Sequence, residues 1–370
     1  VGARLAFTRD LVFSSSHLIN RHLDVLPEQT RAYLRLFRNR TSSEALLGTV
    51  EAMRDLNVLV IGDAIVDEYI YGEALGKSSK DPVMVMRKQA EERYPGGSLL
   101  VANQVANFTG RTDLLCLLGD HAEQRNFIEA QIGKNVTPRF FTRTGSATLV
   151  KRRMVESYSL NKLLEIYIHD EGEPPKALQD EIAVWLDEHL DQYDLVLCTD
   201  YGHGLLTAPL VDRLCQQARF LAVNTQANAG NRGFHTIRRY PRADIACIAE
   251  HEIRLEARQQ QGDLQPLMDD VAASMGDPLF IVTRGKNGCL VRAPDGHFIE
   301  LPALTAHVVD RVGAGDAFLA MAALATATGA DPESIGFLGN LAGAQAVAAI
   351  GSNQQIDARS LQRHLHALLK

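Results

Sequence analysis

The chain has 370 residues, of which 46% are hydrophobic and 22% charged, as expected for a globular protein with one large α/β domain or two small ones. Its formal net charge of −7 argues against a nucleic-acid or membrane surface, and no apolar run approaches the length that spans a bilayer. The five cysteines are widely spaced and show no metal-ligand pattern, so we expect reduced thiols and a cytoplasmic protein.

Residues 1–50 differ from the pattern that follows them, and we interpret them as a helical extension or linker before a domain at 51–370. Residues 13–21 and 27–37 both have features of helices, and residues 38–43 would connect them to the domain. The chain does not begin with Met and shows no signal-peptide pattern, so we expect a fragment of a longer protein.

From residue 56 onward, short apolar runs alternate with helical patterns, which predicts an α/β fold with a parallel sheet. The apolar runs expected to form buried strands are residues 57–62, 114–119, 194–198, 220–224, 245–249 and 278–281. Residues 99–108 and 317–325 are expected to be helices that pack on this sheet.

Two acids, Asp63 and Asp67, follow the first of these strands. Open parallel sheets place ligands at the carboxyl ends of their strands, so both acids are candidates for binding a ligand. The alternative is that they only cap the turn that begins at Gly62.

A basic pair of segments at 148–153 and 161–165 reads as a hairpin. Strand alternation would place Lys151 and Arg153 together on one face. Two cations on one face suit an anionic sugar that carries a phosphate or a carboxylate. A solvated strand edge protected by charge explains them equally well.

The stretch at 309–318 combines a strand end, a Gly-Ala-Gly turn, the acid Asp316 and the start of a helix. Glycines let the backbone turn tightly, and the first turn of a helix presents unpaired N–H groups and the positive end of its dipole. This arrangement suits the negative charge of a phosphoryl group in transfer, beside a carboxylate that could accept a hydroxyl proton. Capping of the helix by Asp316 is the alternative.

The motif Asp-x-x-Gly-Ala-Gly-Asp at 310–316 resembles the C-terminal signature of the ribokinase-like (PfkB) carbohydrate kinases. The run from Gly62 through Gly97 is similar to their heptose-7-phosphate kinase branch, and the resemblance covers roughly residues 56–355. It implies a doubly wound, mainly parallel sheet flanked by helices, with a small β-sheet lid from about 69–95 and 145–168. It also implies transfer of a phosphoryl group from ATP, with Mg²⁺, to a hydroxyl of a sugar or sugar phosphate, and a homodimer formed through the lid.

The resemblance assigns roles to particular residues of this chain. It implies that Asp316 is the catalytic base and that Gly313, Ala314 and Gly315 complete an anion hole. The implied substrate-binding residues are Asp63, Asp67, Gly96, Gly97, Asn103, Lys151, Arg153 and Asp310. The implied nucleotide-binding residues are Asn224, Thr283, Gly285, Gly288, Asn340 and Gly351. Glu252 and Asp200 are the implied residues of the magnesium network.

Three positions depart from the family pattern: Leu100 and Ala249 stand where Asn is expected, and Asn224 where an Asp-Pro-Lys run usually begins. Asn103, one helical turn after Leu99, either replaces the missing Asn or the sugar contact is lost. These departures support an alternative hypothesis, in which the chain is a degenerate module that binds a sugar phosphate or nucleotide without catalysis.

Phe-Ser-Ser-x-x-Leu-Ile-Asn at 13–20 resembles the closing helix of nucleotidyltransferase domains that are fused to sugar kinases in some bacterial proteins. We therefore expect an upstream nucleotidyltransferase domain, for which this chain would be the kinase half. A scaffold for that domain, rather than a kinase, is a further alternative.

Overall fold

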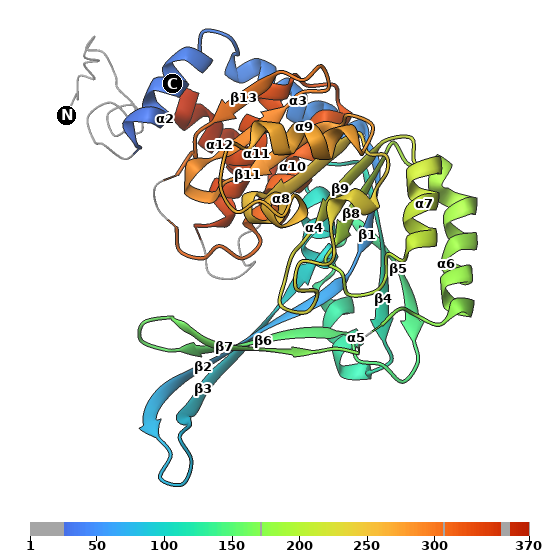
Figure 1. Cartoon of the computed structure of the whole chain (residues 1–370), viewed down its shortest axis with the longest axis vertical. Coiled ribbons are helices and arrows are strands. Elements are labelled where there is room, and N and C mark those ends of the chain that lie inside the picture. Colours follow the sequence, from blue (N-terminus) through green and yellow to red (C-terminus); the bar gives the residue numbers. More distant parts are fainter. Residues whose placement is uncertain (1–25, 171, 306–307, 349–355, 370) are drawn as a thin grey trace, which may run out of the picture.

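The computed structural model describes residues 26–170, 172–305, 308–348 and 356–369, which form two β-sheets and the helices around them. Nine strands form the main sheet in the order β13-β12-β11-β10-β9-β8-β1-β4-β5 (Figure 1). Their bounds are β1 (Asn57–Gly62), β4 (Arg111–Gly119), β5 (Val136–Arg143), β8 (Leu195–Asp200), β9 (Leu221–Thr225), β10 (Ile245–Ala249), β11 (Leu279–Thr283), β12 (Cys289–Arg292) and β13 (Phe298–Leu301).

All neighbouring strands from β5 to β11 are parallel, and β12 pairs antiparallel with both of its neighbours. The chain builds outward from β1 through β4 to β5 and then returns to the other side of β1 with β8. The predicted doubly wound, mainly parallel sheet is thereby confirmed. Such a reversal of strand order leaves a crevice for ligands outside the carboxyl ends of the strands.

After Asn57, strand β1 has no polar side chain, and both of its faces are covered. Val58 and Val60 face one core cluster, whereas Leu59 and Ile61 face the other, and all four are fully buried. The first cluster is covered by α4 (Ser98–Val105), α5 (Ala122–Gln131), α10 (Ala314–Ala327), α11 (Pro332–Ala346) and α12 (Ala358–Leu369). The second is covered by α6 (Lys176–His189), α7 (Ala208–Gln217), α8 (Glu250–Glu256) and α9 (Gln265–Ala273). The described residues also include four short 3₁₀ segments: η1 (Met53–Asp55), η2 (Leu190–Gln192), η3 (Ile237–Arg239) and η4 (Gly285–Asn287).

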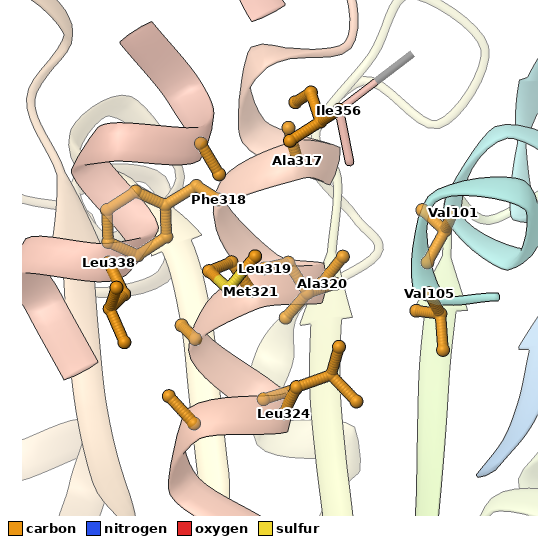
Figure 2. Close-up of a cluster of buried hydrophobic side chains, with 14 of the residues drawn as sticks. Val101, Val105, Ala317, Phe318, Leu319, Ala320, Met321, Leu324, Leu338 and Ile356 are labelled. Carbon is orange, nitrogen blue, oxygen red and sulfur yellow. The ribbon is translucent and has the colours of Figure 1, made fainter. Parts of the chain in front are cut away.

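Helix α10 runs through the first core, and Figure 2 shows its apolar side chains together with those of α4 and α11. Small residues allow this close approach: a Cβ added to Gly339 of α11 would lie 2.8 Å from the Phe318 ring. A Cβ added to Gly336 of α11 would likewise lie 2.9 Å from side-chain atoms of Leu301 and Val291. The small-residue pattern of both helices therefore serves packing.

A second, four-stranded sheet projects from the main body in the order β3-β2-β6-β7 (Figure 1). It consists of β2 (Ala64–Lys77), β3 (Met84–Gly97), β6 (Leu149–Glu156) and β7 (Lys162–Ile168). Its strands cover most of the lid predicted at 69–95 and 145–168, and β2 begins two residues after β1 ends. The lid therefore grows directly from the switch point of the main sheet.

Helices α2 (Glu28–Phe37) and α3 (Ser43–Ala52) belong to the segment that the sequence analysis treated as an extension. The Phe37 ring stacks on Phe337 of α11 with 4.4 Å between centroids, and the Thr30 hydroxyl donates to the Ala303 carbonyl at 3.1 Å. Residues 38–42, expected as part of a linker, form the turn between the two helices. Both helices are thus packed on the main body, whereas the segment at 13–20 lies outside the described residues.

No helix in the described parts of the chain combines the length and apolar character needed to cross a bilayer.

Candidate active site

The Gly-Ala-Gly-Asp turn forms the N-terminus of α10. Gly313 caps the helix with φ of +78°, a left-handed conformation that favours glycine, and its carbonyl accepts the first helical bond from Ala317 at 2.9 Å. A Cβ added to Gly315 would meet no atom within 4 Å, so open space lies beside the first turn. Asp316 lies in this first turn, where the positive end of the helix dipole favours a carboxylate.

The Asp316 carboxyl faces Tyr201, whose hydroxyl donates to Asp316 Oδ1 at 2.7 Å. Loss of solvent around this carboxyl raises the pKa of Asp316 to about 6, although the Tyr201 hydrogen bond opposes the rise. The negative charge of Asp67 raises the same pKa further, and the Lys151 ammonium lowers it. A carboxyl group with this pKa is ionised at neutral pH but remains basic enough to accept a proton.

Tyr201 is a residue of this site that sequence reasoning missed. It follows β8 directly, is 2% exposed, and packs with Ile65 and Leu149 at the base of the lid. Its hydroxyl bonds Asp316 while its backbone N–H donates to Asp63 Oδ2 at 3.1 Å. Its signal in the sequence is the Asp-Tyr pair at the end of β8, where the family resemblance assigns a role to Asp200 alone.

Asp63 is buried at the carboxyl end of β1 and accepts hydrogen bonds from three backbone N–H groups. These belong to Tyr201, His203 and Leu205, at 3.1, 3.1 and 3.4 Å. Desolvation, followed by repulsion from Asp200, raises the pKa of Asp63 to about 6. The carboxylate therefore anchors the loop after β8, and its predicted contact with substrate stays a prediction.

The lid presents a polar face in which Asp67, Lys151 and Tyr167 lie side by side on β2, β6 and β7. Two residues further along β6 on the same face, Arg153 lies beside Tyr69 and Glu165. Lys151 and Arg153 thus share a face, as the alternation indicated.

The two cations of this face differ in their partners. Arg153 forms ion pairs with Asp67 and, at 2.9 Å, with Glu165, so it organises the lid. Lys151 is 6% exposed, and its ammonium lies 5.0 Å from the centroid of the Tyr167 ring. Desolvation lowers the pKa of Lys151, while the charges of Asp67 and Glu165 raise it.

Gly96 and Gly97 allow neighbouring groups to approach β3 closely where the lid begins. A Cβ at Gly96 would lie 2.2 Å from Asp67 Oδ2, and one at Gly97 would lie 2.6 Å from the Asp63 carbonyl oxygen. Asp310 lies across from the lid and accepts a 2.8 Å hydrogen bond from Lys162 of β7. Gly96 and Gly97 therefore lie against Asp67 and Asp63 at the lid base. Asp310 instead contacts β7 at Lys162, which pairs with Val155 toward the far end of β6.

Asn103, predicted to bind substrate, makes a different set of contacts. Its amide donates to the Gln131 carbonyl at 3.0 Å and accepts from the Gly133 N–H at 2.8 Å. Both of its polar atoms thus close the end of α5. Because the amide is occupied at this helix end, the structure offers a packing role for Asn103 and does not place it with Asp67 and Lys151.

The two acids expected in the magnesium network have unlike environments. Glu252 Oε2 accepts from the Ala249 N–H at 2.6 Å and Oε1 from the Ala227 N–H at 3.0 Å. Desolvation raises the pKa of Glu252, and the negative charge of Asp316 contributes to the rise. A carboxylate with two oxygens that each accept one bond still has lone pairs for the water shell of Mg²⁺, so Glu252 fits that ion.

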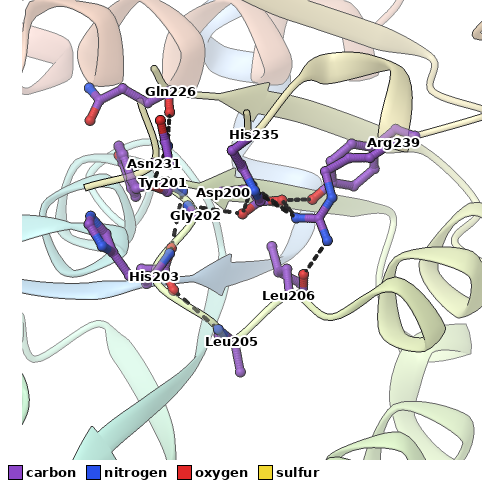
Figure 3. A network of polar contacts seen from close by, with 12 residues as sticks. Asp200, Tyr201, Gly202, His203, Leu205, Leu206, Gln226, Asn231, His235 and Arg239 are labelled. Carbon is purple, nitrogen blue, oxygen red and sulfur yellow. Dashed lines mark hydrogen bonds and ion pairs between the residues drawn. The ribbon is translucent and has the colours of Figure 1, made fainter. Parts of the chain in front are cut away.

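Asp200 lies in a closed network of polar contacts (Figure 3). One oxygen accepts from His235 at 2.6 Å, and the other accepts from Arg239 at 2.6 Å and from Tyr240 at 2.7 Å. These three partners compensate the buried charge without a metal. Asp200 therefore fits a structural role better than the predicted one in magnesium binding. The described residues contain no cluster of three or more His, Cys, Asp or Glu side chains that could hold a metal ion.

Three of the residues expected to bind the nucleotide lie at the carboxyl ends of β9 and β11, namely Asn224, Thr283 and Gly285. The Asn224 amide donates to the Cys247 carbonyl at 2.7 Å, linking β9 to β10. Thr283 ends β11, and Gly285, with φ of +55°, begins the turn that follows. A Cβ on Gly285 would meet nothing within 4 Å, which leaves room for a ligand.

Gly288 and Asn340 contact the segment after β13. A Cβ on Gly288 would lie 1.9 Å from the Leu301 carbonyl oxygen, so this glycine is required by packing. The Asn340 amide approaches the Pro302 carbonyl at 3.4 Å. Gly351 lies outside the described residues.

Comparison with known proteins agrees with the geometry of this site. Residues 55–359 match the sequence profile described as pfkB family carbohydrate kinase. The bifunctional protein HldE of Koribacter versatilis is 29% identical over 301 residues, which cover 80% of this chain and 61% of that protein. The chain thus spans about three fifths of the length of the curated relatives it matches.

Solved structures share the fold. Phosphofructokinase-2 from Escherichia coli in complex with potassium aligns with a TM-score of 0.69 at 14% identity, covering 85% of this chain and 100% of that one. Arabidopsis thaliana ribokinase complexed with ribose and ATP aligns with a TM-score of 0.63 at 16% identity, covering 84% and 99%.

Proposed function

Since the chain belongs to the pfkB family of carbohydrate kinases, we propose that it transfers the γ-phosphate of ATP to a hydroxyl of a heptose-phosphate-like sugar, with Asp316 as general base. One observation carries the assignment of the base. Asp316 stands at the N-terminus of α10, its pKa is raised to about 6, and its hydrogen-bond partner is a neutral tyrosine hydroxyl. A carboxylate locked in an ion pair would be too weak a base for this task.

In this mechanism the substrate lies between the lid face and α10. Asp67 and Lys151 orient its hydroxyl groups, and the Asp316 carboxylate accepts the proton of the attacking hydroxyl. The N–H groups at the start of α10, beginning with Ala314 and Gly315, stabilise the charge on the transferred phosphoryl group. Positioning and charge stabilisation supply most of the acceleration in such reactions.

ATP and Mg²⁺ are proposed as cofactors. The family assignment supports both, and the ribokinase named above was solved with ATP. Bound Mg²⁺ would neutralise charge on the phosphates. Glu252 is the acid of this chain whose surroundings fit the water shell of that ion.

We further propose a cytoplasmic protein in which this kinase domain is joined to a nucleotidyltransferase domain. The matched relatives are named as bifunctional proteins and are longer than this chain. All five cysteines are free and buried, which suits a reducing compartment.

The test is ATP consumption by the wild-type protein with a panel of heptoses, other sugars and their phosphates, in parallel with Asp316→Asn. We expect turnover with at least one acceptor and a loss of about 10²–10⁴-fold in kcat for the variant. The pKa of Asp316 in the folded protein lies above its ordinary value, so protonation of this carboxyl stabilises the folded state. This stabilisation is fully present below about pH 4 and is lost as the pH rises through 6. At neutral pH the variant should consequently be at least as stable as the wild type. A kcat of Asp316→Asn above a tenth of the wild-type value would contradict the assignment of Asp316 as the base.

The departures at Leu100, Asn224 and Ala249 favour one competing function, a module that binds sugar phosphates or nucleotides without catalysis. The internal hydrogen bonds of Asn103 agree with it, because that residue does not compensate for Leu100. Calorimetric binding of ATP and a sugar phosphate, with no ATP consumed by the mixture, would establish this second function.

A further inference from the structure

The loop that follows β9, residues 226–234, lies against the loop that follows β8 at the carboxyl edge of the main sheet. Two asparagines of this loop, Asn228 and Asn231, direct their side-chain amides at the backbone carbonyl of Tyr201. The Nδ2 atoms lie 2.8 Å and 3.3 Å from that oxygen, respectively. Neither asparagine has a role in the reaction as described above, yet both contact the residue whose hydroxyl bonds Asp316.

The two loops approach each other closely at Gly202. This glycine has φ of +74°, and a Cβ added to it would lie 2.9 Å from Asn231 Nδ2. Figure 3 shows Asn231 beside Gln226 and Tyr201, and the Asn231 amide also donates to the Gln226 carbonyl at 2.6 Å. The loop after β9 therefore supports the loop after β8 at the point where Tyr201 leaves the strand.

The Asn228 side chain uses its two polar atoms for different contacts. Its Oδ1 accepts from the N–H groups of Gly230 and Asn231 at 2.9 and 3.2 Å, which closes the turn of its own loop. Its Nδ2 donates to the Tyr201 carbonyl in the other loop. An aspartate or a serine closes such a turn as well, because only an acceptor oxygen is needed. The donated bond is therefore what distinguishes an asparagine at this position.

Tyr201 is held on both sides of its Cα atom. Its N–H donates to Asp63 Oδ2 at 3.1 Å, and its carbonyl accepts from Asn228 at 2.8 Å. The hydroxyl at the other end of the same residue donates to Asp316 Oδ1 at 2.7 Å. Hydrogen bonds weaken steeply as their geometry deteriorates, so a displaced Tyr201 backbone would weaken the bond to Asp316.

From these contacts we propose that Asn228 is a positioning residue, which holds the Tyr201 hydroxyl on the Asp316 carboxyl by fixing the Tyr201 backbone. This inference rests on the proposed kinase function, to which it adds a residue that acts on the base through another side chain. Without the Asn228 bond, the Tyr201 hydroxyl stabilises the Asp316 carboxylate less, so the pKa of this carboxyl rises. Because only the ionised carboxyl accepts a proton, turnover then falls at acidic pH and recovers at alkaline pH.

Other charged groups act on the same carboxyl and stay in place in the experiment. They are Asp67 of β2, Lys151 of β6 and Glu252 of α8. Glu252 Oε1 accepts from the N–H of Ala227, the residue before Asn228, at 3.0 Å. This bond comes from the backbone, so a change of the Asn228 side chain does not remove it.

Two variants of Asn228 test the proposal. Asn228→Ala removes both polar atoms, whereas Asn228→Ser keeps an oxygen that closes the turn but ends one bond short of the amide nitrogen. We expect each to lower kcat by about threefold at pH 6, the size of one lost hydrogen bond, with kcat at pH 9 and both KM values near those of the wild type. Should Asn228→Ala fail to fold, which circular dichroism shows, Asn228→Ser carries the test.

The matched control is Gln179→Ala on α6. The Gln179 amide also donates a 2.8 Å bond to a backbone carbonyl, that of Pro174, on a helix that carries no residue of the site. This variant should leave the pH profile unchanged. If it moves the acidic limb as far as the Asn228 variants do, the effect is one of general stability and the proposal is wrong.

The double variant Asn228→Ala/Tyr201→Phe tests the route of the effect. If Asn228 acts through the Tyr201 hydroxyl, the double variant has the same pH profile as Tyr201→Phe alone. A further shift in the double variant, an unmoved limb in both Asn228 variants, or a change confined to KM would each overturn the proposal.

A titration of the aspartate carboxyl carbons by ¹³C NMR measures the same shift without turnover. The Asp316 signal is the one that Asp316→Asn removes, and it should titrate at higher pH in both Asn228 variants than in the wild type. If the wild type consumes no ATP with any acceptor, the kinase function fails, while this titration still decides whether Asn228 acts on Asp316. An Asp316 signal that titrates as in the wild type would show that it does not.

Discussion

The Asp316 carboxyl is subject to opposing influences that set the pH range in which it can accept a proton. Burial and the charge of Asp67 favour the protonated acid, while the Tyr201 hydroxyl and the Lys151 ammonium favour the carboxylate. Because the resulting pKa is about 6, we predict an acidic limb in kcat/KM with its midpoint near pH 6 and a slope of one proton. Initial rates measured from pH 5 to 9 check this, and a flat profile between pH 5 and 7 would exclude Asp316 as the titrating base.

The carboxyl of Asp63 also has a pKa of about 6, so either this group or Asp316 could produce the acidic limb. Tyr201→Phe removes only the hydroxyl that bonds Asp316, and it should raise the pKa of that acid and move the acidic limb to higher pH. The matched control is Tyr193→Phe, because the Tyr193 hydroxyl donates to Asp113 at the same distance of 2.7 Å. Both variants should lose some stability, on the order of 1 kcal/mol. An unshifted limb in Tyr201→Phe would assign it to a group other than Asp316.

Single residues of the site differ in how far the sequence predicts them. Asp316 and Gly313 lie in one continuous motif, so local spacing was sufficient to single them out. Tyr201, the partner of Asp316, comes from a loop more than a hundred residues away, and this contact depends on how β8 and α10 are placed in space. Asn103 shows the opposite failure, since its spacing suggested a ligand contact while its amide closes α5.

At the level of elements, α2 behaves as part of the folded body. Phe37 is fully buried against Phe337, and Arg40 forms a 2.6 Å ion pair with Glu333 at the start of α11. The sequence predicted the helix itself from its periodicity. The surface that receives it could not be predicted, because that surface is built by the last third of the chain.

We predict that Phe37→Ala lowers the free energy of unfolding by about 3–5 kcal/mol, the usual cost of removing a buried aromatic side chain. The control is Leu36→Ala on the same helix, where the side chain is 59% exposed and the change should stay within about 0.5 kcal/mol. Urea unfolding followed by circular dichroism measures both. Equal, small effects would mean that α2 lies outside the cooperative unit.

The surface of the molecule is not uniformly polar, because apolar side chains of the lid are exposed to solvent. The buried strands of the main sheet were predictable as continuous apolar runs, but the lid strands alternate between its two faces. Exposed apolar residues gather on the lid at Leu75, Val83, Met84, Val85, Leu163, Leu164 and Ile166. Leu164 and Ile166 lie on β7, an edge strand, on the face opposite Arg153. Exposed apolar groups on an edge strand commonly mark an interface, which is consistent with the expected homodimer through the lid.

We therefore predict that Leu164→Glu weakens self-association, because it places a charge where a second lid would otherwise bury an apolar side chain. Sedimentation velocity over a range of protein concentrations should show the wild type as a dimer and the variant shifted toward monomer by at least about tenfold in dissociation constant. Val184→Glu is the matched control, since Val184 of α6 is 55% exposed and Leu164 is 58% exposed, yet α6 covers the main sheet far from the lid (Figure 1). If the two variants sediment alike, the lid face is not the contact. Because Leu164 points away from the face that carries Lys151, a monomeric variant that retains turnover would show that each lid closes its own site without help from a partner.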